Sequence, residues 1–357
     1  MKIPTPASAL ACLILGLVAG TPQTADAADT AEQFYSKTKV RMIIGTAVGG
    51  SYDLMGRLTA RHIRNQLPGK PAILVQNMPG GGSLIASNYL YNVAPQDGSV
   101  LGAVVPGIIF TAMFGEKSAR YDPTKFHWIG YAMDAVSVPT VFHTSPVKSL
   151  AEMREKEVVM GSGGISSMDA TNARLFNALL GTKIKLVTGY KGGDAINLAM
   201  ERGEIHGRAS QAWSAWKAVR PDWIRDRKLV PILQVALEPV PDPELKGIPL
   251  LVDLVKNDAD RKIARVYTAI ATIGRPVVMG PGVPADRVAF MRKAYAAMLK
   301  DPAFLAEAAK QRISLKPMEG EKIQALVAET AALDGKLVAR MKSIVYRKRA
   351  KKKRKKN

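Results

Sequence analysis

The chain has 357 residues, enough for two domains or for one large α/β domain. Hydrophobic residues make up 47% of it and charged residues 23%, a composition that excludes an intrinsically disordered protein apart from the chain ends. The formal net charge of +21 makes the protein strongly basic, and part of this charge lies in one short C-terminal run.

The first 27 residues have the parts of an export signal. A basic residue precedes the run ALACLILGLVAG (9–20), whose 12 apolar residues are too few to cross a bilayer of about 30 Å as a helix. Ala25 and Ala27 supply the small residues of a cleavage site. We therefore expect cleavage after Ala27 and export to the periplasm; an uncleaved membrane anchor is the alternative. The single cysteine, Cys12, lies in the apolar run, so the mature chain would have no disulfide.

From about residue 40 onward, short β-branched runs alternate with amphipathic stretches. This alternation predicts βαβ units around mainly parallel sheets, which is an α/β fold. The predicted strands are 40–45, 72–76, 100–105, 126–132, 137–144, 158–162, 184–189, 230–236 and 267–273. The predicted helices are 54–67, 84–93, 168–180, 195–202 and 285–299.

Two places suggest that the chain crosses between two lobes. One is the adjacent pair of apolar runs at 126–144, and the other is YTAIATIGRP (267–276). If both places carry strands, two strands connect the lobes and form a hinge. We expect lobe 1 to consist of 28–135 and 270–346, and lobe 2 of 136–269.

Four glycine-rich turns each follow a predicted strand and precede a predicted helix. Glycine permits a positive φ and a close approach of a ligand to the backbone. The helix behind each turn directs its unpaired N–H groups into the turn, so the turn can bind an anion without any positive side chain. The four turns are GTAVGGSYD (45–53), NMPGGGSLIAS (77–87), GSGGISSMDA (161–170) and GYKGGDAINL (189–198).

Each turn also has a purely structural interpretation, because glycine is common where a strand leads into a helix. The three glycines after Pro79, and the run GSGGISS (161–167) with three glycines and three hydroxyls, are harder to explain in this way. Asp53 fits a helix cap better than an acceptor for a ligand hydroxyl or amine. Trp213 fits either a pocket wall or the core, whereas core packing is favoured for Trp216.

The patterns of several enzyme classes are absent from the sequence. The first turn lacks the lysine of a nucleotide-binding P-loop, and no GxSxG hydrolase elbow occurs. The four histidines match no metal-ligand spacing, and the carboxylates near the turns form no acid–base pair. We therefore expect no catalytic residue, no metal and no cofactor. The histidines are His62, His127, His143 and His206, and the carboxylates are Asp169, Asp194, Glu201 and Glu204.

The C-terminal run RKRAKKKRKKN (347–357) contains nine basic residues among eleven, so +12 of the +21 charge belongs to the rest of the chain. A run of like charge is typical of a solvated, disordered tail. Nucleic-acid binding is the sharper alternative, but an exported protein does not meet this polyanion, and we expect no such partner. Attraction to anionic lipid would contribute about 1 kcal/mol per basic residue near a surface and would not define the function.

Five blocks in the right order resemble the extracytoplasmic solute receptors of tripartite tricarboxylate transporters, the TctC or Bug family. The segment VQNMPGGGSLIASNYLYNVAPQDGSVLGAV (75–104) carries the resemblance most clearly through its PGGGS and APQDG turns. The similarity extends from about residue 40 to 335 and leaves the basic tail outside. The other blocks are GTAVGGSYDLMGRLTARHI (45–63), GSGGISSMDATNARLFNALLG (161–181), VTGYKGGDAINLAMERGEIHG (187–207) and VVMGPGVPADRVAFMRKAYAAMLKDPAFLAEA (277–308).

The resemblance implies a two-lobed, type II-like periplasmic-binding-protein fold that closes on a small carboxylate without catalysis. It also implies membrane permease subunits as partners, and we expect a monomer. In this family the ligand carboxylates are held by backbone N–H groups and ordered waters. The candidate ligand-binding residues are Gly49, Gly50, Ser51, Asp53, Pro79, Gly80, Gly81, Gly82 and Ser83 in lobe 1, and Gly161, Ser162, Gly163, Gly164, Ser166, Ser167, Tyr190, Gly192, Gly193, Asp194 and Trp213 in lobe 2.

One position departs from the family pattern. Family members often carry proline before the paired glycines of the first turn, whereas Ala47 and Val48 stand here, so the resemblance does not imply the course of this turn. Two other function classes remain as alternatives: a sensory protein that docks on a membrane receptor, and a periplasmic enzyme that uses Asp194 or Asp53 as a base.

Overall fold

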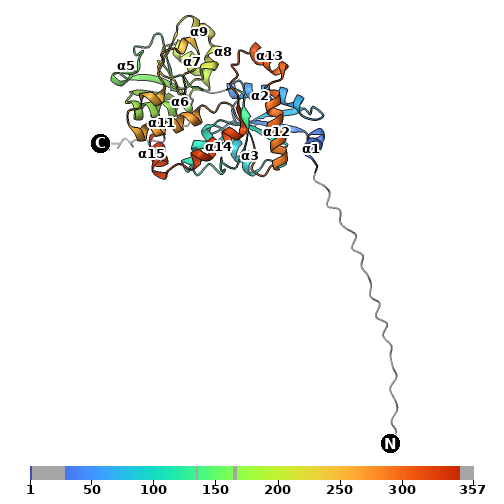
Figure 1. The fold of residues 1–357 in the computed structure, drawn as a ribbon. Helices are drawn as coiled ribbons and strands as arrows, with labels where there is room; N and C mark the ends of the chain where they lie inside the picture. The colour runs from blue at the N-terminus through green and yellow to red at the C-terminus, as the bar shows by residue number, and fades with distance from the viewer. Residues whose placement is uncertain (2–28, 134–135, 164–166, 346–357) are drawn as a thin grey trace, which may run out of the picture.

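The computed structural model describes Met1 and residues 29–133, 136–163 and 167–345. The expected export signal, the basic tail and the candidate site residues Gly164 and Ser166 lie outside these ranges. The described chain forms two β-sheets with helices packed around them (Figure 1).

The first sheet has six strands in the order β11-β4-β10-β3-β1-β2. Its β1 is the apolar run VRMII, which pairs in parallel with β2 on one side and β3 on the other. β10 is antiparallel to both β3 and β4, and β11 is antiparallel to β4. The strands are β1 (Val40–Ile44), β2 (Ile73–Asn77), β3 (Val100–Ala103), β4 (His127–Tyr131), β10 (Val277–Met279) and β11 (Met318–Glu319).

The second sheet has five strands in the order β7-β6-β8-β5-β9, all from the middle of the chain. β6 is parallel to β7 and β8, whereas β5 is antiparallel to β8 and β9. The strands are β5 (Thr140–Phe142), β6 (Val158–Ser162), β7 (Ile184–Thr188), β8 (Gly207–Arg208) and β9 (Leu229–Pro231).

The predicted α/β class with two helix-flanked sheets is confirmed, but both sheets are mixed rather than mainly parallel. The parallel part of each sheet consists of strands joined through a helix, which returns the chain to the same edge. Most of the antiparallel pairs involve β5 or β10, the strands by which the chain enters a sheet after passing through the other one; the pair of β11 and β4 is the exception. β10 is the clearest case, because it joins the first sheet only after the whole second sheet has formed in the chain order.

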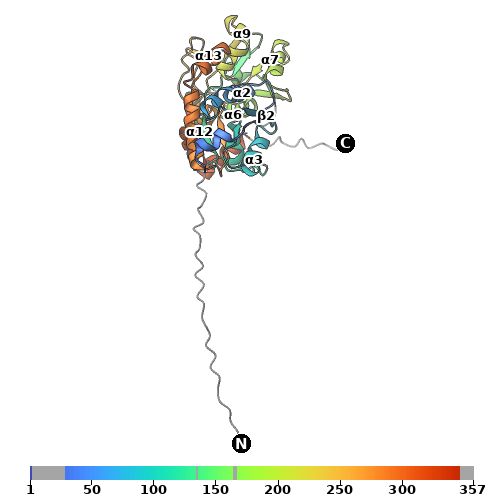
Figure 2. The ribbon, with the colours of Figure 1, turned by 90° about the vertical axis from the view of Figure 1, so that its right-hand side faces the viewer.

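The helices divide into those from the two ends of the chain and those from its middle. Figure 1 shows α7, α8 and α9 gathered at one end of the molecule and α1, α3 and α12 at the other, and Figure 2 shows the same separation from the side. The end segments form α1 (Ala31–Lys37), α2 (Ser51–Ile63), η1 (Arg64–Gln66), α3 (Leu84–Asn92), α4 (Gly107–Met113), α12 (Ala285–Met298), α13 (Pro302–Lys310), α14 (Gly320–Ala331) and α15 (Gly335–Val345). The middle forms α5 (Leu150–Glu155), α6 (Met168–Leu180), α7 (Gly193–Glu201), α8 (Trp213–Val219), α9 (Pro221–Arg225), η2 (Pro243–Leu245), α10 (Leu251–Leu254) and α11 (Asp258–Ala271).

The predicted strand at 267–273 is wrong, because most of it is the last part of helix α11. The side chain of Asn257 caps this helix by accepting a hydrogen bond from the Asp260 N–H. The residues that α11 buries include Ile263, Tyr267 and Ile270, which follow helical and not strand spacing. The later crossing between the sheets is therefore a helix followed by the short segment 272–276, and not a strand.

Helix α11 also connects the two halves of the core. Its Tyr267 side chain is fully buried, stacks on Phe110 of α4 with ring centroids 5.3 Å apart, and donates a hydrogen bond to Asn172 of α6. One hydrophobic cluster consequently extends from Trp128 in the first sheet to Met160 in the second. If the two sheets move relative to each other, this shared cluster has to stay packed. The division into lobes at 135 and 270 stays a prediction.

None of the helices within the described ranges combines the length and the apolar character needed to cross a lipid bilayer.

Candidate functional site

The first two glycine turns lie side by side. They follow β1 and β2, which are adjacent and parallel, so both leave the same edge of the first sheet. The Met78 N–H donates to the Ile44 carbonyl at 2.8 Å, and the Asn77 side-chain amide donates to the Thr46 carbonyl at 2.9 Å. These bonds tie the beginnings of the two turns to each other.

Asp53 holds the first turn in place from inside. Its carboxylate is only 4% exposed and accepts hydrogen bonds from the Gly49 N–H at 3.0 Å, from Arg57 Nε at 3.0 Å and from Asn77 Nδ2 at 2.8 Å. Burial opposes ionisation, but these donors together hold the pKa of the carboxyl below its usual value. The expected capping role of Asp53 is wrong: the N-cap of α2 is Gly50, without a side-chain hydrogen bond, and Asp53 lies within the first turn of the helix and bonds back to Gly49.

The lowered pKa of Asp53 predicts a pH-dependent contribution to stability. A carboxyl whose pKa is lower in the folded state than in the unfolded state stabilises the fold above the unfolded pKa of about 4, and loses this effect as pH falls below it. We expect Asp53→Asn to lower the free energy of unfolding by about 1–3 kcal/mol at pH 7. Urea denaturation at several pH values should show the difference from the native chain shrinking below about pH 4. A difference that stays constant between pH 3 and pH 7 would contradict this role of the charge.

The second turn is a run of four residues in the left-handed region. The φ angles are 140° at Gly80, 58° at Gly81, 65° at Gly82 and 71° at Ser83, a course that only glycine follows without strain over three positions. Ser83 is fully buried; its hydroxyl donates to the Gly45 carbonyl at 3.1 Å and accepts from the Val105 N–H at 3.0 Å. The Ser83 side chain therefore holds the turn, while Gly81 and Gly82 are exposed.

The first turn presents backbone to solvent. Gly49 has a φ of 91°, and both Gly49 and Gly50 are exposed. Val48, at one of the positions where the family that the sequence resembles often carries proline, is 71% exposed. Gly50 precedes the 13-residue helix α2 without any side-chain cap, so the N–H groups of its first turn, at Ser51 and beyond, have no capping side chain.

The third and fourth turns form a second pair. They follow β6 and β7, which are adjacent and parallel in the second sheet. The Gly189 N–H donates to the Ser162 carbonyl at 3.0 Å, and Ser162 Oγ lies 2.7 Å from Ser167 Oγ. Ser167 caps α6 by accepting from the Ala170 N–H. Gly161 is buried, whereas Gly163 is exposed.

A buried ion pair supports the helices behind the second pair of turns. Arg208 of β8 lies 3.2 Å from Asp169 in the first turn of α6, and Arg208 Nη1 donates to Asn197 of α7 at 3.3 Å. The same nitrogen would be 3.2 Å from a Cβ at Gly193, where α7 begins. Burial raises the pKa of Asp169, and the Arg208 guanidinium opposes this rise. Arg208 thus connects α6 to α7 through its contacts with Asp169 and Asn197.

The remaining candidates of the second sheet differ in exposure. Asp194 and Gly192 are exposed, and Tyr190 is half-buried. Trp213 is only 4% exposed and belongs to a hydrophobic cluster with Trp216 and Trp223. The structure therefore places Trp213 in the core, and the core packing expected for Trp216 is confirmed.

Sequence reasoning missed Arg275. This residue lies in the segment 272–276 between α11 and β10, yet its Nη2 donates to Ser51 Oγ at 3.0 Å. The guanidinium also lies 5.3 Å from the centre of the Tyr52 ring, at the start of α2. Arg275 thus adds a positive side chain beside the first turn, which we had expected to bind an anion through backbone N–H groups. The 224 positions between the two partners leave no local signal for this contact.

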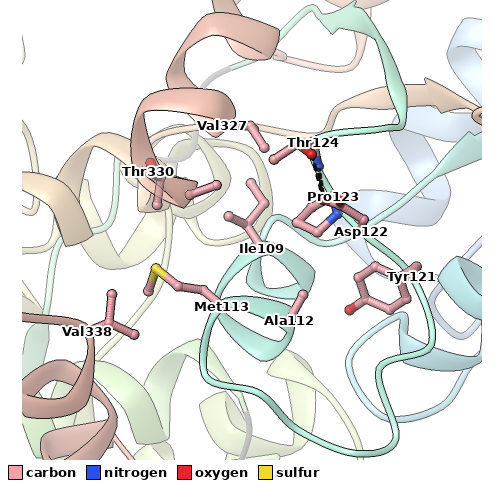
Figure 3. A pocket seen from close by; sticks show the side chains of 11 residues that line it. Ile109, Ala112, Met113, Tyr121, Asp122, Pro123, Thr124, Val327, Thr330 and Val338 are labelled. Carbon is pink, nitrogen blue, oxygen red and sulfur yellow. Dashed lines mark hydrogen bonds between the residues drawn. The ribbon is translucent and has the colours of Figure 1, made fainter. Parts of the chain in front are cut away.

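Two cavities of the described chain lie away from the glycine turns. One, of about 270 Å³, is lined by α4, the segment 121–124, α14 and α15 (Figure 3). Its polar groups are used within the protein: Asp122 accepts from the N–H and hydroxyl of Thr124, and Tyr121 donates to the Ile108 carbonyl. The other lies along the proline-rich segment 239–253.

The chemistry that the turns offer is therefore hydrogen-bond donation. The two pairs of glycine turns lead into α2, α3, α6 and α7; α2, α3 and α7 begin without a side-chain cap, whereas Ser167 caps α6. The guanidinium of Arg275 stands beside the first pair, and the exposed Lys191 belongs to the second. Among the described residues, no three side chains of His, Cys, Asp or Glu gather as metal ligands would.

Known proteins match this chain in fold but not in sequence. No family model matches the sequence, and no curated protein matches it either. A TctC solute-binding protein from Polaromonas, solved without ligand, has a TM-score of 0.64 at 18% identity, over 88% of this chain and 100% of that chain. A protein of R. palustris with adipate has a TM-score of 0.64 at 18% identity, over 87% and 98%. MatC from Rhodopseudomonas palustris, with bound malate, has a TM-score of 0.61 at 18% identity, over 87% and 99%.

The chain thus has the fold of TctC solute-binding proteins. This confirms, for the fold, the resemblance that the glycine blocks indicated.

Proposed function

We propose that the protein is a periplasmic receptor that captures a small organic carboxylate between two lobes and does not transform it. The single observation that carries this proposal is the pairing of the glycine turns. Each pair leaves the carboxyl ends of two adjacent parallel strands, where α/β sheets bind ligands, and each turn opens a helix.

The ligand class follows from what these turns donate. Backbone N–H groups at helix starts favour negative charge, by about 0.3–1 kcal/mol for each helix at an exposed site. Several such contacts select an anion without a dedicated cationic pocket. The adipate and malate in two proteins of the same fold agree with a carboxylate ligand.

Capture and release would follow from movement of one lobe relative to the other. The first pair of turns belongs to lobe 1 (28–135 and 270–346) and the second pair to lobe 2 (136–269). The continuous core around α11 keeps one side packed, so the lobes would close by rotation about this side. The closed form would then deliver its ligand to permease subunits of a tripartite tricarboxylate-type transporter.

Native mass spectrometry of the purified chain, followed by thermal unfolding with adipate and malate, tests this function. We expect a bound small acid, or a rise in the unfolding temperature with at least one of the acids. A ligand at 100 times its Kd stabilises the folded state by about 2.7 kcal/mol. The neutral diamide of adipate is the matched control and should give no rise. A ligand-free mass together with unchanged unfolding in a wider set of di- and tricarboxylates would refute the proposal.

A further inference from the structure

Arg275 connects the segment between the sheets to the first glycine turn. Its side chain is only 7% exposed, yet it reaches Ser51, the first residue of α2, at 3.0 Å. The exposed glycines of the turn, Gly49 and Gly50, immediately precede this contact in the chain. The guanidinium therefore contacts the turn whose backbone we assign to the ligand.

We propose that Arg275 determines the specificity of the site by supplying the positive charge that recognises a ligand carboxylate at the first turn. This inference rests on the proposed function, because it concerns the ligand of that same site. It names a charged side chain at the first turn, where the donors considered so far were backbone N–H groups.

The local charges favour this role. The carboxylate of Asp53, the acidic group in the first turn of α2, is bonded to Gly49, Arg57 and Asn77, which keeps its negative charge away from the turn's outer face. The guanidinium and the start of α2 then add two positive sources at one place. A guanidinium is always charged and presents a planar fork of donors that matches a carboxylate.

The position of Arg275 is fixed from both sides. Helix α11 leads into its segment and is anchored to α6 through the bond between Tyr267 and Asn172. On the other side the chain enters β10, whose Val277 and Val278 pair with β3. A side chain held between two anchored elements loses little further freedom when it binds a ligand, which favours selective binding.

Titration calorimetry of adipate and malate with the native chain, Arg275→Gln and Arg275→Lys tests the inference. We expect Arg275→Gln to lower the affinity for the acid about 10- to 100-fold, since hydrogen bonds to charged groups are the strong ones. Arg275→Lys keeps the charge but not the fork, and should lose less. Arg265→Gln is the matched control: it removes one positive charge at an exposed position of α11, and should change affinity less than threefold.

The outcomes separate this inference from the proposed function. If the native chain binds an acid and folded Arg275→Gln binds it within twofold, the role of Arg275 is refuted while the receptor proposal stands. If Arg265→Gln reproduces the whole loss, the effect comes from the net charge of the chain and not from Arg275 at the turn, and the inference is again refuted. If the native chain binds no carboxylate, both fail. If Arg275→Gln does not fold, Arg275→Lys carries the test instead. Equal affinities of Arg275→Lys for adipate and for its monoamide would then refute charge recognition.

Discussion

Asp169→Ala is expected to lower the free energy of unfolding by about 3–5 kcal/mol, the usual cost of removing one partner of a buried ion pair. Both Asp169 and Arg208 are almost fully buried, so the substitution leaves the Arg208 guanidinium without its countercharge in the interior. Asp169 also accepts a hydrogen bond from the Ser210 N–H at 2.9 Å, which would be left unmade. Denaturation in urea, followed by circular dichroism, measures the change.

The control for Asp169→Ala removes both charges together. The double variant Asp169→Leu with Arg208→Met leaves no unpaired charge, and we expect it to be clearly more stable than Asp169→Ala. If the free energy of unfolding of Asp169→Ala lay within about 1 kcal/mol of that of the native chain, the ion pair would not support α6 and α7 as described.

Gly163→Leu is expected to abolish ligand binding, with a loss of more than about 100-fold, while the fold stays intact. Gly163 is exposed beside the third turn and has no positive φ, so a side chain here brings little backbone strain. An added Cβ would be 3.3 Å from the Tyr190 carbonyl, the tightest of its contacts, and the rest of the leucine would project from the turn where we place the ligand. Gly81 is less suitable, because its φ of 58° would strain any larger residue.

The matched control for Gly163→Leu is Gly335→Leu. Gly335 also has no positive φ, has open space around its Cβ position, and lies at the start of α15. Both variants should unfold within a few degrees of the native chain, and only Gly163→Leu should fail to bind the acid in calorimetry. Binding by Gly163→Leu at native affinity would remove the third turn from the site.

Strands that are continuous apolar runs were predictable almost to the residue. β1, β6 and β7 lie where the β-branched runs indicated, and a glycine turn connects each of them to the helix that comes next. A parallel strand that is buried on both faces is apolar over nearly its whole length, as β6 is, so its sequence carries the signal by itself. Arg41 in β1 and Lys185 in β7 interrupt their runs without hiding the strands. The partner of a strand carries no such signal, so the antiparallel pairing of β10 and β5 was not foreseen, and both sheets are mixed where mainly parallel sheets were predicted.

The segment 258–271 shows how local composition misled the prediction. Its last residues, with Val266, Tyr267, Thr268 and Ile270, have a composition typical of strands, yet they continue a helix that Asn257 caps. The buried positions at helical spacing were readable in the sequence once the cap was recognised. The N-cap was the signal that would have corrected this prediction.

Part of the candidate site could likewise be predicted from the sequence, and part of it could not. The glycine turns could be found from the sequence because each is a local pattern at the end of a strand. The internal roles of Asp53 and Ser83 could not, because their partners Asn77 and Gly45 come from other turns. Arg275 could not be found either, since only the fold brings it to Ser51.

The central claim is that the two pairs of turns face each other across a gap that closes on a carboxylate. Spin labels at Val48 and Lys191, both exposed, would report the distance between the first and fourth turns, and residues 28–357 contain no native cysteine to interfere. A second labelled pair, at Val48 and the exposed Leu74 of β2, stays within the first sheet and serves as the control.

Double electron–electron resonance with and without a saturating acid then gives the deciding measurement. The account predicts that the distance between positions 48 and 191 shifts to shorter values and becomes more uniform with the ligand, while the distance between 48 and 74 stays the same. An unchanged distribution between 48 and 191 at saturating ligand would contradict it.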